Sequence, residues 1–243
     1  MAYASWRGTL GLIKPTRDPG SLEELIRMLP EGIGVVPLLL DIRTGSKKEF
    51  TEAFAAYEPQ VRELAEQEVD VIHPGGTAPF MLLGYERERR EVAAWEKKYG
   101  IPMFTAGQNH IRALRAMKVK RFINISATTW DDSNLVQGYF AGAGLSCLKR
   151  NVFPVDFQRI GSLSSHEVYA FIKKAFLAQK RCDGIYIQGG QWRVLDILDI
   201  LEQDLGVPVI HAGVAKAWET MARLNVRQPM KGYGALLAEM PQG

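Results

Sequence analysis

The amino-acid sequence predicts an α/β protein built from two homologous halves. Asp70-Val-Ile-His-Pro-Gly-Gly76 closes one apolar run, and the similar phrase Asp183-Gly-Ile-Tyr-Ile-Gln-Gly-Gly190 closes another. A helix-like stretch separates each phrase from a second matched pair, Gly100-Ile-Pro-Met-Phe-Thr105 and Gly206-Val-Pro-Val-Ile-His211. Strands that alternate with helices form parallel sheets, and ligands of such sheets bind at the carboxyl ends of the strands. The two glycine turns are therefore predicted to face one shared cleft.

In the first half, four short apolar runs with turn signals at both ends predict parallel strands covered on both faces. They span residues 9–13, 35–40, 69–73 and 102–105. Between the second and third runs, Phe54, Tyr57, Val61 and Leu64 recur at helical spacing and predict a helix over 50–68.

The second half repeats this order, with strands predicted over 122–125, 146–153, 185–187 and 209–210. Residues 131–134 form a helix N-cap cluster, and Ser164 to Glu167 resembles a capping box ahead of a helix over 168–178. We expect a first half over 1–115, completed by the helix at 214–224 and the tail up to 243, and a second half over 116–213.

Composition narrows the class of protein. The 243 residues are 47% hydrophobic and 23% charged, which is typical of a globular chain with a substantial core. The net charge of +3 comes from interleaved acids and bases, so no nucleic-acid partner is expected. No apolar run approaches the roughly 20 residues that span a bilayer, so no membrane partner is expected either. The N-terminus lacks a basic-then-apolar leader, which predicts a cytoplasmic protein.

The glycine turns offer backbone N–H groups to a ligand. Gly75, Gly76, Thr77 and Ala78 predict one anion pocket, and residues 189–191 (Gly189, Gly190 and Gln191) predict a second. The alternative is that these glycines only permit a tight turn between strand and helix. Neither segment matches a phosphate-loop or dinucleotide motif, so nucleotide binding is disfavoured. Thr77 either donates its hydroxyl to a ligand carboxylate or caps its own helix.

Other strand ends supply polar candidates. His211 repeats the position of Thr105, where a neutral imidazole can move a proton or can simply be hydrogen-bonded beside the cleft. Asp41 and Arg43 follow the second strand; Arg43 either binds a substrate carboxylate or offsets Asp41. Thr128 and Thr129 end the first strand of the second half. The two cysteines, Cys147 and Cys182, lack metal-type spacing, and the cleft offers no clustered metal ligands.

The whole layout resembles the aspartate/glutamate racemase superfamily, in particular its maleate isomerase and arylmalonate decarboxylase branch. The resemblance covers nearly the whole chain and is carried by Gly11-Leu-Ile-Lys-Pro15, Gly76-Thr77, Ala127-Thr-Thr-Trp-Asp-Asp-Ser-Asn134, Leu195-Asp196, Leu205-Gly-Val-Pro-Val209 and Lys231-Gly-Tyr-Gly234. It implies two flavodoxin-like halves related by a pseudo-twofold axis, each with a four-stranded parallel sheet and helices on both faces. It also implies chemistry next to a carboxylate without a cofactor, and adds Pro15 to the substrate-binding residues.

The chain departs from this family at two positions. The family places one cysteine in each half, and the matching positions here are Gly76 and Gly189. Racemisation with two thiols and thiol addition to maleate are therefore not expected. The remaining cradle comprises the amides of Thr77, Ala78 and Gly190 with the hydroxyls of Thr77 and Thr129, where Thr129 stands at the decarboxylase's tyrosine position. Asp41 and Arg43 partly replace an apolar pocket, which indicates a smaller or more polar ligand.

These observations predict a cofactor-independent lyase, an arylmalonate-decarboxylase-like enzyme that acts on a small carboxylic acid through an enediolate. Its catalytic residues are predicted to be His211, Thr77 and Thr129. One alternative is a hydrolase or hydratase that uses the same cradle with His211 as base. Another is a carboxylate-binding protein without activity. No metal is expected, and a homo-oligomer is left open.

Overall fold

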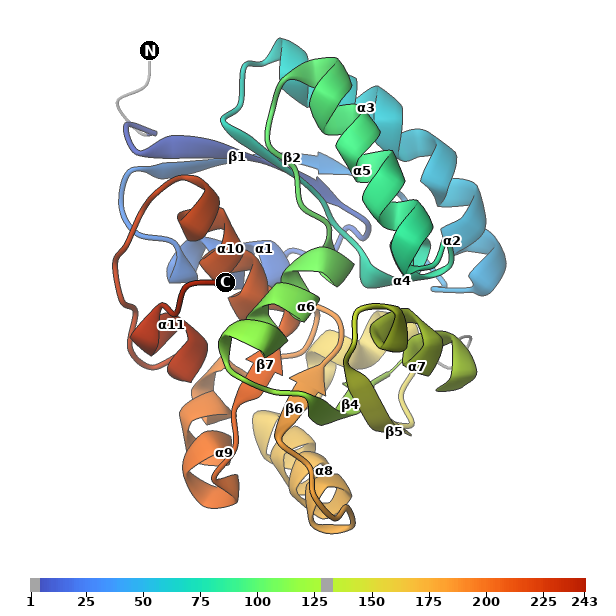
Figure 1. The fold of residues 1–243 in the computed structure, drawn as a ribbon, viewed down its shortest axis with the longest axis vertical. Coiled ribbons are helices and arrows are strands. Elements are labelled where there is room, and N and C mark those ends of the chain that lie inside the picture. Colours follow the sequence, from blue (N-terminus) through green and yellow to red (C-terminus); the bar gives the residue numbers. More distant parts are fainter. Residues whose placement is uncertain (1–4, 128–132) are drawn as a thin grey trace.

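The computed structural model describes residues 5–127 and 133–243 and contains two parallel β-sheets (Figure 1). The first has strand order β2-β1-β3 and the second β5-β4-β6-β7. The strands are β1 (Gly8–Lys14), β2 (Ile33–Leu39), β3 (Val71–Pro74), β4 (Arg121–Ser126), β5 (Ser146–Val152), β6 (Gly184–Ile187) and β7 (Val209–His211). Every strand pair is parallel, which confirms the predicted α/β class with two parallel sheets.

Helices follow the strands in both halves. Those of the first half are α1 (Gly20–Met28), α2 (Lys47–Ala53), α3 (Tyr57–Glu66), α4 (Thr77–Met81), α5 (Tyr85–Tyr99) and α6 (Ala106–Ala116), with a 3-10 turn η1 (Phe54–Ala56). The later ones are α7 (Ser133–Gly142), α8 (Ser165–Leu177), α9 (Leu198–Leu205), α10 (Ala212–Arg223) and α11 (Ala235–Glu239), with 3-10 turns η2 (Phe157–Ser162) and η3 (Leu195–Ile197). The predicted capping box is present: Ser164 and Glu167 cap α8 reciprocally.

The repeated sequence phrases make equivalent hydrogen bonds in the two halves. The Asp70 carboxylate accepts the backbone N–H of Thr9 at 2.7 Å, and the Asp183 carboxylate accepts that of Arg121 at 3.0 Å. Each aspartate thus fastens the start of its strand to the neighbouring strand. The internal repeat seen in the sequence is therefore a repeat in structure.

The fourth strand predicted for the first half is wrong, because residues 102–105 make only an isolated bridge between Ile72 and Met103. In the second half the equivalent pairing continues to Ile187 and His211. Pro74 stands where Ile187 would donate its N–H, and proline has none.

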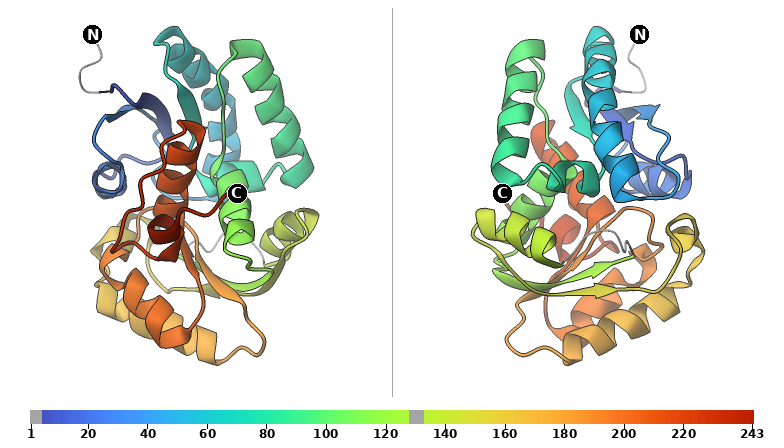
Figure 2. Two further views of the ribbon diagram at one scale, coloured as in Figure 1. Left: turned by 60° about the vertical axis from the view of Figure 1, so that its left-hand side comes forward. Right: turned by 90° about the vertical axis from the view of Figure 1, so that its right-hand side faces the viewer.

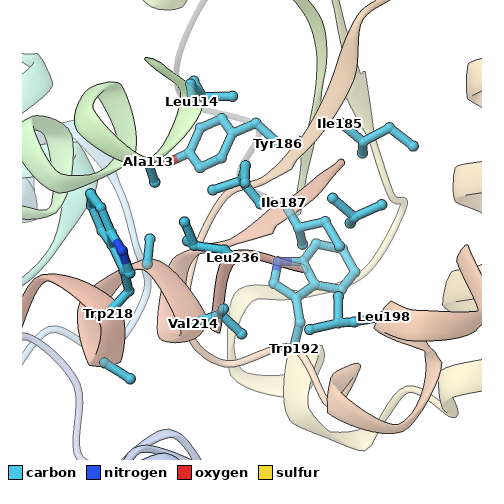
Figure 3. Packing of buried hydrophobic residues seen from close by; sticks show 14 of the residues in the cluster. Ala113, Leu114, Ile185, Tyr186, Ile187, Trp192, Leu198, Val214, Trp218 and Leu236 are labelled. Atoms are coloured by element: carbon cyan, nitrogen blue, oxygen red, sulfur yellow. The ribbon is translucent and has the colours of Figure 1, made fainter. Parts of the chain in front are cut away.

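Helices α6 and α10 lie between the two sheets (Figures 1 and 2). Helix α10 packs against both α6 and α1, and one large apolar cluster extends through both halves. Figure 3 shows part of this cluster, with Tyr186 and Ile187 from β6, Ala113 and Leu114 from α6, and Val214 and Trp218 from α10. The tail is held by α9, since the N–H of Ala235 donates to Glu202 at 2.7 Å. None of the helices in the described segments is long and apolar enough to cross a membrane.

Candidate active site

A cavity of about 120 Å³ lies where the strand ends of both sheets meet. Its wall includes Pro15 after β1, the turn after β3 and the turn after β6, as expected for a ligand site in a parallel sheet. Of the residues predicted to bind substrate, Pro15, Gly76, Thr77, Ala78, Gly189, Gly190 and Gln191 line it. The predicted residues Thr128 and Thr129, and Asp131 and Asp132 of the N-cap cluster, lie outside the described residues.

The two cavity glycines have nearly equal positive φ angles. The φ angles of Gly76 and Gly189 are +96° and +97°, a region that side chains rarely adopt. A Cβ on Gly76 would lie 3.0 Å from the Tyr57 hydroxyl, whereas a Cβ on Gly189 would meet its nearest atom, in Trp192, at 3.6 Å. The turn after β6 therefore leaves more room beside the cavity.

A neighbouring aromatic side chain holds each turn in place. The Tyr57 hydroxyl donates to the carbonyl oxygen of Gly75 at 2.6 Å, so that Gly75 supports the first turn without lining the cavity. The Trp192 indole N–H donates to the carbonyl oxygen of Gln188 at 2.8 Å in the second. The second turn differs from expectation, because a loop and not a helix follows it, with η3 beginning only at Leu195.

Thr77 is the first residue of α4, and Gly76 occupies the cap position. The Thr77 hydroxyl makes no hydrogen bond within the described residues, so it does not cap its helix. The N–H groups of Thr77 and Ala78 belong to the first helical turn, which has no intrahelical acceptors for them. These three donors are available to a ligand in the cavity.

Lys14 is a cavity residue that the sequence patterns did not indicate. Its ammonium is held by the Asp18 carboxylate at 2.7 Å and by the Thr16 carbonyl oxygen at 2.5 Å. Burial acts to raise the pKa of Asp18, but hydrogen bonds from Lys14 and Thr16 outweigh it and lower that pKa to about 2. Gln191, from the other half, donates to the same carboxylate at 3.5 Å. Lys14 is therefore a fixed, ion-paired cation.

Lys216, on the second turn of α10, also lines the cavity and was also missed. Within the described segments its ammonium has no hydrogen bond and no ion pair. Burial, reinforced by the nearby charge of Lys14 and opposed by Asp18, lowers the pKa of Lys216 to about 8. The sequence did offer one signal for this residue: a lysine lies between Ala215 and Trp218, one turn after the start of an otherwise apolar helix.

Three histidines near the cavity, His73, His110 and His211, are fully buried, and burial lowers the pKa of each. His211 is fully buried and is not among the cavity residues, and burial followed by the charge of Lys216 lowers its pKa to about 3 against the opposing effect of the Gly189 backbone. His110 and His73 line the cavity but are also fully buried. His110 shares a hydrogen bond with the Tyr186 hydroxyl at 2.6 Å, and His73 bonds the Phe104 carbonyl oxygen. This geometry does not favour proton donation by His211.

Two further sets of predicted residues lie off the cavity. Asp41 and Arg43 line a neighbouring surface groove, where they form an exposed ion pair at 2.6 Å. Cys147 is buried on β5, and Cys182 precedes β6 at the end of the sheet away from the cavity. The cavity wall consequently carries no thiol from this chain.

Comparison with known proteins agrees with this architecture. Residues 10–237 match the model of the arylmalonate decarboxylase family. The arylmalonate decarboxylase of Bordetella bronchiseptica is 24% identical over 182 residues, covering 73% of this chain and 75% of that protein.

Solved structures show the same fold. A double mutant of arylmalonate decarboxylase superposes with a TM-score of 0.87 at 20% identity, covering 96% of this chain and 99% of that one. The maleate cis-trans isomerase of Nocardia farcinica superposes with a TM-score of 0.86 at 19% identity, covering 96% of this chain and 98% of that one. The maleate isomerase of Pseudomonas putida S16 with maleate superposes with a TM-score of 0.85 at 19% identity, covering 95% of this chain and 97% of that one. With a family match that spans nearly all of both halves, the chain belongs to the arylmalonate decarboxylase family.

Proposed function

We propose that this protein is a cofactor-independent lyase that removes carbon dioxide from a small carboxylic acid in the cavity between its halves. The observation that carries the proposal is the cavity wall itself. It includes an ammonium (Lys216) and a hydroxyl (Thr77) that have no partner among the described residues, and it includes no thiol. The family relation to an arylmalonate decarboxylase supports the reaction type.

The cavity wall has an apolar part that suits the leaving carboxylate and a polar part that suits the negative charge left on the substrate. Phe50, Phe157 and Ile160 form an apolar part of the wall, which favours conversion of a charged carboxylate into neutral carbon dioxide. When the carbon–carbon bond breaks, its electron pair moves onto the rest of the substrate; in a malonate it reaches the second carboxylate as an enediolate. Thr77, the amide of Ala78 and Lys216 supply donors and positive charge for that oxygen.

Decarboxylation is favoured over isomerisation by the absence of a cavity thiol. A mutant of the Nocardia farcinica maleate isomerase was solved with a covalently bound succinylcysteine intermediate, so a cysteine of that protein bonds to its ligand. Cys147 and Cys182 lie off the cavity wall in this chain and do not occupy such a place.

The test is a thermal-shift screen of substituted malonates, 3-oxo acids, maleate and aromatic acids, followed by NMR analysis of products in deuterated water. We expect at least one stabilising acid to lose carbon dioxide and to gain deuterium at the carbon that carried it. Thr77→Val should lower kcat/KM for that acid about 100-fold, as loss of one oxyanion donor does. Thr51→Val, whose exposed hydroxyl bonds only its own helix, is the matched control.

Two results would contradict the proposal. Stabilisation by carboxylates without any product would indicate a binding protein. Formation of fumarate from maleate, without release of carbon dioxide from any acid, would indicate an isomerase.

A further inference from the structure

Lys14 and Lys216 line one cavity but are held differently. The ammonium of Lys14 has the Asp18 carboxylate at 2.7 Å and two acceptors from Thr16, and its residue is only 4% exposed. Lys216 has no such partner among the described residues and retains some exposure, although both of its chain neighbours are fully buried. These acceptors hold Lys14 in place, whereas the amine of Lys216 is free to approach a ligand.

The position of Lys216 on α10 directs it toward the cavity. It stands four residues after Ala212, hence on the same helix face, and both residues line the cavity. The two glycine turns line the same cavity, and Gly76 and Gly189 have no side chains there. A small ligand that rests on either turn therefore lies in the same space as this amine.

The surroundings of Lys216 also favour its neutral, nucleophilic form. The charged groups near it are Lys14 and Asp18, and the nearby imidazoles of His73, His110 and His211 are kept uncharged by burial. With a pKa lowered to about 8, Lys216 carries a neutral amine in a larger fraction of molecules near neutral pH than an ordinary lysine does. Burial beside a second cation is a recognised way to activate a lysine toward carbonyl groups.

We propose that Lys216 forms an imine with the carbonyl group of a small 3-oxo carboxylate bound in this cavity. The inference rests on the proposed lyase function and names its substrate class. It also explains how the reaction proceeds without a cofactor and without a cavity thiol, because the imine nitrogen accepts the electrons.

The reaction balances with water and one net proton, both from solvent. The neutral amine adds to the carbonyl carbon, and the carbonyl oxygen leaves as water with uptake of one solvent proton to give a protonated imine. The bond to the carboxylate carbon then breaks, carbon dioxide leaves, and the electron pair forms an enamine that neutralises the nitrogen. A proton adds to the enamine carbon, and water hydrolyses the resulting imine to a ketone and the free amine.

The experiment is borohydride trapping on the intact protein with acetoacetate and oxaloacetate, read by intact mass and peptide mapping. We expect a stable alkyl adduct on Lys216 and none on Lys14, which serves as a control within the same cavity. Between pH 6 and 9, the trapping rate should rise through the pKa of Lys216. Lys216→Arg, which keeps the positive charge, should abolish the adduct, whereas Lys173→Arg, at an exposed ion pair, should not.

The outcomes separate this inference from the proposed function. An adduct on Lys216 without release of carbon dioxide supports the imine and counts against the lyase. Release of carbon dioxide from a malonate, with no adduct from either oxo acid, overturns the imine and leaves the lyase standing. Because trapping is measured on the unmodified sequence, a misfolded variant cannot produce either result.

Discussion

Two lysines of one cavity are distinguished by the atoms around them. Asp18 offsets the charge of Lys14 within hydrogen-bonding distance, and together they form a permanent ion pair. The same two charges act on Lys216 without a hydrogen bond to it. The ammonium of Lys14 lowers the pKa of Lys216, and the carboxylate of Asp18 raises it. The pair thus adjusts the charge state of Lys216 as well as the shape of the cavity wall.

Replacing Lys14 with glutamine should raise the pKa of Lys216, because it removes the nearby cation and leaves Asp18 without its partner. The change is measured from the pH dependence of acetylation of Lys216 by acetic anhydride, read by peptide mass spectrometry. We expect the midpoint to move to higher pH and the rate at pH 7.5 to fall several-fold. Lys173→Gln is the control, and an unchanged midpoint in Lys14→Gln would show that the two lysines do not interact.

Alanine at either cavity glycine should destabilise the fold, and Gly76→Ala should cost more than Gly189→Ala. Both need a positive φ, which costs about 1–3 kcal/mol for other residues. At Gly76 the Cβ must also displace the Tyr57 hydroxyl. Urea unfolding measures both, with Gly144→Ala as control since its φ is +74° and nothing lies within 4 Å of a Cβ there. Equal losses at Gly76 and Gly144 would exclude the contact with Tyr57.

At the scale of elements, a glutamate in each half holds the extended segment that follows its helix. Glu96 of α5 accepts the N–H of Met103 at 2.7 Å, and Glu202 of α9 accepts the N–H of Val209 at 2.9 Å. Glu202 has a second duty, because it also accepts the N–H of Ala235 and so anchors α11. The two halves therefore share a link between a helix and the segment after it. In the second half, the same glutamate also links this segment to α11.

Glu202→Ala should destabilise the protein by about 1–3 kcal/mol for each of the two N–H groups that lose their acceptor. Denaturant unfolding measures the total loss in the free energy of unfolding. Hydrogen exchange at the amides of Val209 and Ala235 shows which of the two sites is weakened. Glu239→Ala, at an exposed position on α11, should change stability little. Unchanged exchange at Ala235 would mean that the tail is held by other contacts.

At the scale of the whole molecule, the halves are joined through a buried carboxyl group. Glu88 of α5 is fully buried and accepts hydroxyl hydrogen bonds from Thr105, the N-cap of α6, and from Tyr139 of α7. Burial raises the pKa of Glu88 to about 7, although both hydrogen bonds act to lower it. An ionisable group consequently sits where helices from both halves meet.

The pH dependence of stability should reveal this group. The pKa of Glu88 is higher in the folded than in the unfolded protein. Its contribution to the free energy of unfolding is therefore complete below about pH 4.5. As the pH rises through 7, this contribution is lost, and the free energy of unfolding falls by on the order of 3 kcal/mol. Glu88→Gln should remove that loss, so that its stability between pH 5 and 8 falls less than that of the wild type. Urea titrations at both pH values test this, with the exposed Glu86→Gln as control. Parallel pH profiles for wild type and Glu88→Gln would contradict it.

Features that depend on neighbouring residues were predictable from the sequence. The order of strands and helices, the capping box at Ser164 and the repeated glycine turns all follow from local periodicity, local hydrogen bonds or a required positive φ. The exception is the strand over 102–105, whose cause lies across the sheet, because Pro74 lacks the N–H that its equivalent Ile187 carries. The turns and the shared cleft could therefore be located before any chemistry was assigned.

By itself the sequence determined the class of the fold, its internal repeat and the strand ends around which the cavity forms. The tertiary structure alone decided which side chains reach that cavity. Lys14 and Lys216 are about two hundred positions apart and meet only because α10 packs between the two sheets. His211, the N-cap of α10, is fully buried and does not line the cavity. Burial and charge depend on distance in space, and no spacing along the chain encodes that distance.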